Sequence, residues 1–291
     1  MGSAKALRAS KLWYFATTLL VLQMSIVVTG GLVRVTGSGL GCPTWPKCTQ
    51  DSFIPDESQS LYHSAIEFGN RLLTIALLSA AVATLLAAWK RQDLRSLAIF
   101  QVLGIFGQGI LGGITVLTKL NPFTVASHLL LSMFLIAGAA SLQYKVRPFE
   151  KIDLNFAGEN GKKFGNRVGN NFGKALATLA FITIFAGTIV TGSGPHAGDV
   201  KAPRFDFDLY LAAQIHSSLV AATALLAIFI AIKFPRGVAN WLLAVILGQG
   251  LIGLVQWWQG LPQVLVGLHL VGASLFWFAI WRTRISFLYK R

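Results

Sequence analysis

A glutamate stands in the apolar stretch SAIEFGNRLL, where few charged residues are expected. Glu67 is preceded by His63 four residues earlier and followed by Asn70 three residues later. Positions three and four apart share one face of a helix, so these three polar side chains would form one row. An ionisable group inside an apolar helix is costly and generally marks a functional site. We take Glu67 as a candidate catalytic residue, and its pairing with Arg71 or Lys47 is the structural alternative.

Three of the five histidines lie well inside apolar stretches, and two of these three match in depth. His216 and His269 each come about seven residues after the outer start of their stretch, which places both roughly 10 Å below one membrane surface. Helix bundles commonly hold a haem between two such imidazoles. An interhelical hydrogen bond is the alternative for each histidine alone, and a transition-metal site would need a third ligand. The matched pair favours axial ligation of a haem.

Three further polar residues are candidates because they lie near the predicted outer boundary of the membrane. Arg34 and Arg71 suit haem propionates, because a guanidinium matches a carboxylate in shape and charge; snorkelling to lipid headgroups is the alternative. His196, in the loop GSGPHAGD, is expected to be a loop residue or to meet a haem edge.

The two cysteines, Cys42 and Cys48, lie in the segment GCPTWPKC. We expect this loop on the outer, oxidising side, where a disulfide is favoured. Free thiols are the alternative. Zinc is disfavoured, since only two sulfurs and no nearby histidine are available.

Long membrane helices are the elements that must position these residues. The chain has 291 residues, 54% hydrophobic and 12% charged, against roughly 25% charged in soluble domains. We therefore predict an all-α integral membrane protein. The first stretch is too long for a signal peptide and lacks a clear cleavage site, so it is expected to be retained. The eight apolar stretches are long enough to span a bilayer and cover residues 12–34, 63–88, 96–117, 124–143, 175–193, 209–233, 238–257 and 262–281.

The net charge of +14 does not indicate nucleic acid, because Lys and Arg gather in alternate loops rather than on one face. Such a bias marks the cytoplasmic side of a membrane protein. We therefore predict a multi-pass protein of the cell membrane with both termini cytoplasmic.

The two halves of the chain repeat. Gln108 precedes His128 by 20 residues, Gln249 precedes His269 by 20 residues, and the string VTGSG ends both the first and the fifth stretch. Self-similarity of this kind indicates a duplicated architecture. We expect two pseudo-symmetric four-helix bundles joined by a cytoplasmic linker, divided as residues 1–144, 145–174 and 175–291.

The halves differ in chemistry. Aligning the second stretch on the sixth sets Asn70 opposite His216 and Glu67 opposite Ala213. The second half therefore has two histidines and no acid, whereas the first has one histidine and a carboxylate. We expect the second half to hold a cofactor and the first to carry out a reaction.

These residues resemble the haem A synthase family, and its actinobacterial branch in particular. The resemblance rests on TGSGLGCPTWPKC, IEFGNR, TGSGPHAGD and the single histidines of the fourth, sixth and eighth stretches, and it covers nearly the whole chain. It implies an oxidoreductase of cytochrome oxidase assembly that oxidises the C8 methyl of haem O to the formyl group of haem A by successive hydroxylations.

The resemblance also implies residue roles. Glu67 would be essential to catalysis, and His216 and His269 would hold the iron of a haem b. His128 would ligate the iron of the substrate haem in the first half.

Two departures from the family pattern matter. Many members have a histidine where this chain has Asn70, so either His63 swings in to ligate the substrate iron or the iron keeps an open site facing Asn70. The resemblance implies a functional disulfide between Cys42 and Cys48. Some members have a second cysteine pair, and this chain does not, so a mechanism that requires it is excluded.

Expected partners are a haem O synthase, a membrane electron donor and the lipid bilayer, and a homo-oligomer is compatible with the sequence. The main alternative function is a bis-histidine b-type cytochrome that only transfers electrons, although such a protein needs no acid. A transporter ranks third, because its coupling acid would lie near the membrane midplane and Glu67 is expected in the outer third.

Overall fold

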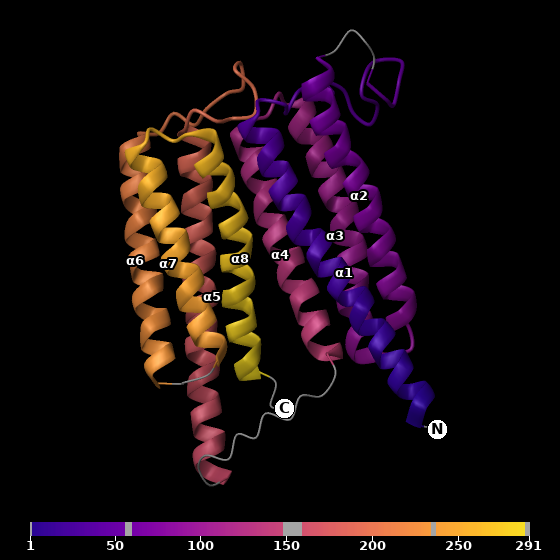
Figure 1. Ribbon diagram of the computed structural model, residues 1–291, viewed down its shortest axis with the longest axis vertical. Helices are drawn as coiled ribbons and strands as arrows, with labels where there is room; N and C mark the ends of the chain where they lie inside the picture. The colour runs from indigo at the N-terminus through magenta and orange to yellow at the C-terminus, as the bar shows by residue number, and fades with distance from the viewer. Residues whose placement is uncertain (1, 56–59, 148–158, 234–236, 289–291) are drawn as a thin grey trace.

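The computed structural model describes residues 2–55, 60–147, 159–233 and 237–288 (Figure 1). Within these ranges the chain forms eight helices and no strand, and each helix contains a segment long and apolar enough to cross a membrane. The predicted all-α fold with eight membrane spans is confirmed. The helices are α1 (Gly2–Val35), α2 (Leu61–Ala88), α3 (Gln92–Leu117), α4 (Pro122–Val146), α5 (Glu159–Ser193), α6 (Leu209–Lys233), α7 (Gly237–Trp258) and α8 (Gln263–Leu288).

Two bundles stand side by side (Figure 1). Helices α1 to α4 pack in a ring, α5 to α8 pack in a second ring, and α1, α4, α5 and α8 meet between them. The long connections α1–α2 and α5–α6 lie at the same end of the molecule, and α5 extends beyond the other helices at the opposite end (Figure 1). The predicted pair of pseudo-symmetric bundles is confirmed.

Part of the expected linker at 145–174 is helical. Residues 148–158 lie outside the described part of the chain, and α5 already begins at Glu159. The apolar stretch expected to start at residue 175 is therefore the continuation of a longer helix with a polar first part.

The ends of α3 and α7 have the same turn, which reveals the repeat in the backbone. After α3, Leu120 N donates to Thr115 O at 2.8 Å, and after α7, Leu261 N donates to Gln256 O at 2.7 Å. Both leucines have a φ of 62°. The residue before each leucine, Lys119 or Gly260, is also left-handed, with a φ of 55° or 73°. A left-handed residue just before the six-residue bond is the Schellman arrangement that ends helices. The duplication thus extends to the loops that lead into α4 and α8.

Polar contacts fasten the helices at the centre of the molecule. The Trp277 indole on α8 donates to Met133 O on α4 at 2.6 Å. Buried Gln23 of α1 donates to Gln101 of α3 at 3.0 Å, and Gln101 donates to Leu135 O of α4 at 3.0 Å. Lipid supplies no hydrophobic drive between helices, so such hydrogen bonds and close packing determine their arrangement.

Candidate functional site

A cavity of about 400 Å³ lies within the first bundle. Glu67, Asn70 and Arg71 line it from α2, and His128 lines it from α4. The volume is in the range of small-molecule sites. The structure therefore brings the acid, the amide and the histidine of the first half to one cavity, which we call the first cavity.

Glu67 is buried and held by two donors. Its side chain accepts a hydrogen bond from Cys42 N at 2.6 Å and a second, with an ion pair, from Arg71 Nη2 at 2.6 Å. Charge-assisted bonds of this kind fix a carboxylate strongly. The pairing with Arg71 considered from the sequence is present, while Lys47 donates instead to Gln50 O at 3.4 Å. Glu67 therefore both pairs with Arg71 and lines the first cavity.

The cysteine loop, residues 42–48, is fastened by a disulfide and by Arg71. Cys42 and Cys48 are bonded and both are fully buried, so the predicted disulfide is confirmed. Arg71 donates to the carbonyls of Cys42, Thr44 and Lys47 at 2.8, 3.0 and 3.1 Å. The guanidinium therefore turns inward and joins the loop to Glu67.

His63 belongs to α2, four residues before Glu67, but it is not among the described residues that line the first cavity. Its Nδ1 is 2.8 Å from Ser38 Oγ, and among the described residues it lines neither of the two cavities discussed here. The chain at Gly41 packs on the backbone of His63, where an added Cβ would be 2.5 Å from its carbonyl oxygen. The loop thus occupies the space above Glu67. Asn70 remains at the cavity and accepts a hydrogen bond from Thr29 Oγ1 at 2.7 Å.

His128 offers a ring without a protein partner. Its buried Nδ1 has no hydrogen bond within the described part of the chain, and a buried polar atom left in this state costs free energy. Its carbonyl accepts from Gln108 Nε2 at 3.1 Å. An added Cβ at Gly112 would be 3.4 Å from the ring, so the glycine gives the imidazole room.

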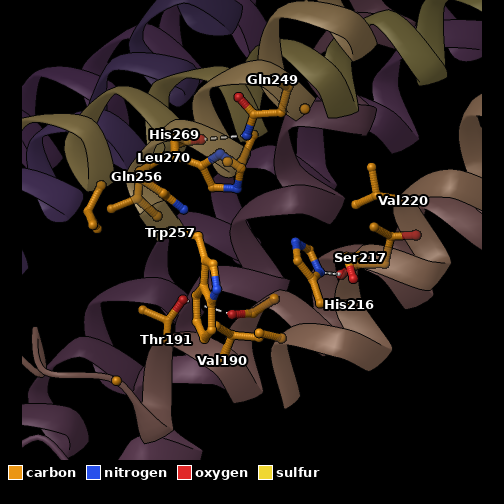
Figure 2. Close-up of a pocket in the computed structure, with 18 of the residues that line it drawn as sticks. Val190, Thr191, His216, Ser217, Val220, Gln249, Gln256, Trp257, His269 and Leu270 are labelled. Carbon is orange, nitrogen blue, oxygen red and sulfur yellow. Dashed lines mark hydrogen bonds between the residues drawn. The ribbon is translucent and has the colours of Figure 1, made fainter. Parts of the chain in front are cut away.

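A second cavity of about 580 Å³ lies in the other bundle. His216 and His269 face each other across it, with ring centres 6.5 Å apart and ring planes at 79° (Figure 2). His216 Nδ1 donates to Thr183 O at 3.0 Å, and the other ring nitrogen is directed toward His269 (Figure 2). The depth match in the sequence thus corresponds to a facing pair.

The spacing of this pair fits a bound metal centre. Two metal–nitrogen bonds of about 2 Å, with the short distance from each nitrogen to its ring centre, add to roughly 6 Å. The measured separation is 6.5 Å, and the buried His269 Nδ1 has no partner in the described ranges. The donor set fits axial ligation of a haem iron.

The two cavities share features that follow the repeat. Gln249 Nε2 donates to His269 O at 2.7 Å, just as Gln108 Nε2 donates to His128 O at 3.1 Å. Gly253 lies beside the His269 ring, where an added Cβ would be 3.1 Å away, as Gly112 does beside His128. The two histidine sites therefore correspond through the repeat, although their other residues differ.

Comparison with known proteins identifies the family. A family model described as cytochrome oxidase assembly protein matches residues 11–198. The chain belongs to this family. The match includes the cysteine loop, Glu67 and His128, and it ends before His216 and His269.

Relatives named "Heme A synthase" are similar to this family member. The protein from Shewanella oneidensis is 28% identical over 197 residues, which are 62% of this chain and 55% of the relative. That from Lysinibacillus sphaericus is 31% identical over 185 residues, 61% and 57% of the two chains. That from Geobacillus thermodenitrificans is 30% identical over 114 residues, 38% and 35%. The chain thus spans about half the length of these curated relatives, and the resemblance seen in the sequence is confirmed for the family.

Two further residues of this family member tie the halves together. Arg34, at the first cavity, donates to His196 O at 2.6 Å and to Thr191 O at 2.7 Å, both in the second half. His196 lines the second cavity, and its Nε2 is 2.7 Å from Leu261 O. His196 is therefore a loop residue at the rim, and Arg34 is a bridge between the halves.

Sequence reasoning missed two groups of residues at these sites. Leu129, Thr191 and Leu270 line both cavities and form the wall between them. Trp45, from the cysteine loop, lines the first cavity. Thr191 lies in the repeated VTGSG string and Trp45 lies in the motif GCPTWPKC, so the signals for both were present in segments already noted for other reasons.

Proposed function

We propose that this protein is a haem A synthase, which oxidises the C8 methyl of haem O to the formyl group of haem A by successive hydroxylations. The observation that carries the proposal is the asymmetry of the two cavities. One has a buried carboxylate and a single histidine, Glu67 and His128, and the other has two facing histidines. Membership of the cytochrome oxidase assembly protein family supports the same conclusion.

His216 and His269 are assigned the haem b of the second cavity. A haem bound there supplies one-electron chemistry. The hydrogen bond from His216 Nδ1 to Thr183 O fixes the ring orientation and the tautomer, as outer partners of metal-binding histidines generally do. The lining of this cavity is mostly apolar, which suits the largely apolar ring of a haem.

The first cavity is assigned to the substrate, haem O. We assign His128 as the axial ligand that the protein supplies. Asn70 stands at the position that corresponds to His216 in the repeat, and its side-chain oxygen accepts a hydrogen bond from Thr29. His63 is directed to Ser38, so we assign the side of the iron toward Asn70 an open or weakly held position rather than a second histidine.

Glu67 is assigned the catalytic role. Cys42 N and Arg71 hold its two oxygens in fixed positions, so the carboxylate is preorganised and needs no rearrangement during the reaction. From the cavity wall it stabilises positive charge that develops at the methyl carbon, or accepts a proton during hydroxylation. Arg71 positions Glu67 and is not itself assigned to propionates.

The proposal also includes the partners of the protein within the membrane and its orientation there. Haem O carries a farnesyl tail, so we propose that a haem O synthase supplies it within the membrane and that a membrane electron donor serves the second half. The Lys and Arg bias supports our proposal that both termini lie in the cytoplasm. A disulfide at the opposite end fits the oxidising side of the cell membrane.

The test is to express the protein in cells together with a haem O synthase and to identify the extracted membrane haems by chromatography and mass spectrometry. The proposal predicts haem A or its hydroxylated precursor with the wild type, and only haem O and haem B with Glu67→Gln, which keeps the size of the side chain and removes its charge. Recovery of only haem B and unchanged haem O from folded wild-type protein supplied with electron donor would instead favour the electron-transfer cytochrome.

A further inference from the structure

The cysteine loop forms part of the wall of the first cavity. Trp45 and Pro46, at the middle of the loop, line the cavity together with Glu67. Among the described lining residues Trp45 is the only Phe, Tyr or Trp. Trp45 is 41% exposed, so part of its aromatic surface is not covered by other residues of the protein.

The position of Trp45 is fixed from both sides. Below it, the indole packs on α3 at Gly113, where an added Cβ would be 2.5 Å from Cδ2 and 2.7 Å from Cε2. Above it, Arg71 bonds the carbonyls of Thr44 and Lys47, the residues that flank the Trp45–Pro46 pair. The disulfide closes the loop around these contacts. Gly113 thus makes the close approach of the indole possible.

The same contacts fix Trp45 relative to the carboxylate. Arg71 Nη2 bonds both Glu67 and the loop carbonyls, and Cys42 N donates to Glu67. Gly30 and Gly109 also line this cavity, and an added Cβ at either would meet nothing within 4 Å. The cavity wall is therefore free of side chains at Gly30 and Gly109, beside the fixed indole of Trp45.

We propose that Trp45 is a substrate-positioning residue, whose indole contacts the flat conjugated ring of haem O and holds it in register with Glu67. The inference rests on the proposed function. Contacts between conjugated rings add to the affinity gained from buried area alone. A ring that shifts in the cavity would present its methyl group incorrectly, so both binding and the completion of the second oxidation depend on this contact.

The experiment compares Trp45→Leu and Trp45→Phe with Trp241→Leu. Trp241 is also 41% exposed, lies on α7 against Phe278, and is absent from the described lining of both cavities. Protein as purified is titrated with haem O without reductant and followed by absorbance. Turnover in membranes then gives KM, kcat and the ratio of hydroxylated precursor to haem A. Mass spectrometry before and after reduction checks the disulfide.

We expect Trp45→Leu to raise Kd and KM about tenfold, the scale of a lost aromatic contact, and to raise the share of hydroxylated precursor. Trp45→Phe should restore most of the affinity, and Trp241→Leu should match the wild type. An unchanged Kd in Trp45→Leu with an intact disulfide would overturn the proposal, as would failure of Trp45→Phe to restore binding.

A second variant decides the case if Trp45→Leu loses its disulfide. Gly113→Ala keeps the indole but forces it away from α3, and it should weaken haem O binding severalfold. Gly107→Ala, on the same helix, meets only Leu131 at an ordinary 3.9 Å and serves as its control. Equal binding by these two variants would overturn the proposal. If the wild type binds haem O without converting it, the proposed function fails, while the titrations still decide the role of Trp45.

Discussion

Glu67 and Arg71 form an ion pair in which each residue also serves the cysteine loop. Glu67 accepts from Cys42 N, and Arg71 donates to the carbonyls of Cys42, Thr44 and Lys47. Removing one member of a buried pair leaves the other charge uncompensated. The carboxylate that a lipid-embedded helix would ordinarily avoid is thus stabilised by the loop that closes the cavity.

Arg71→Lys should disrupt this arrangement although the charge is kept. An ammonium is a point charge and cannot reproduce the fork that serves Glu67 and several carbonyls at once. We expect a loss of about 1–3 kcal/mol in stability, seen as a lower midpoint of thermal unfolding in detergent, and at least a tenfold fall in haem A formation. Lys47→Met is the control, because the Lys47 ammonium contacts only the Gln50 carbonyl and the Phe53 ring among the described residues. Wild-type behaviour of Arg71→Lys would refute this role.

His63→Ala should leave haem O binding unchanged. In the structure the His63 ring bonds Ser38, and His63 is not among the described residues that line the first cavity. Absorbance of the protein titrated with haem O is the measurement. A changed axial-ligand spectrum or a lost affinity in this variant would show that His63 swings in to ligate the iron.

At the level of elements, α3 and α7 are repeated units with glycines at the positions that face the histidines. Gly112 lies beside His128 and Gly253 lies beside His269. Because these positions lack a Cβ, each helix can approach an imidazole closely while a neighbouring glutamine bonds the backbone carbonyl of the histidine. The helices therefore set the orientation of the rings.

Gly253→Ala should reduce the haem B bound by the protein. The new methyl group would be 3.1 Å from His269 Cε1, a separation tight enough to displace the ring from the facing pair. We expect a severalfold fall in haem B per mole of purified protein, measured from absorbance and extracted haem. Gly248→Ala, on the same helix with nothing within 4 Å, should keep the wild-type content. Equal haem B in the two variants would mean that His269 does not depend on this packing.

Across the whole molecule, the two halves are joined at the end that holds the cysteine loop as well as along α4 and α8. Arg34 of the first half donates to the carbonyls of Thr191 and His196 in the second, and Gly39 N donates to Gly198 O at 2.9 Å. Thr191 also belongs to the wall between the cavities. Through the Thr191 carbonyl, Arg34 therefore holds a residue of the wall that separates the two cavities.

Arg34→Met should weaken the junction of the halves. Two carbonyls would lose their charged donor, and each such bond is worth about 1–3 kcal/mol. We expect a lower midpoint of thermal unfolding together with lower haem A formation. Arg95→Met provides a control, since Arg95 is exposed and packs over Trp89. An Arg34→Met protein as stable as the control would show that the bridge contributes little.

Much of this architecture was predictable from the sequence, because hydropathy fixes the spans and the repeat fixes how the halves correspond. The facing of His216 and His269 followed from their equal depth, and the disulfide followed from its compartment. That His63 is absent from the described lining of the first cavity was not predictable, because its ring pairs with Ser38, whose place depends on the loop before α2. The bridging role of Arg34 likewise depends on a loop from the other half.

The most direct test of the account is the identity of the haems bound to purified protein from cells that make haem O, compared for wild type, Glu67→Gln and His269→Ala. We predict haem B with haem O or haem A in the wild type, haem B with unconverted haem O and no haem A in Glu67→Gln, and loss of haem B in His269→Ala. Haem A at the wild-type amount in Glu67→Gln would contradict the assignment of catalysis to the first cavity. Full haem B in His269→Ala would contradict the assignment of haem b to the second cavity.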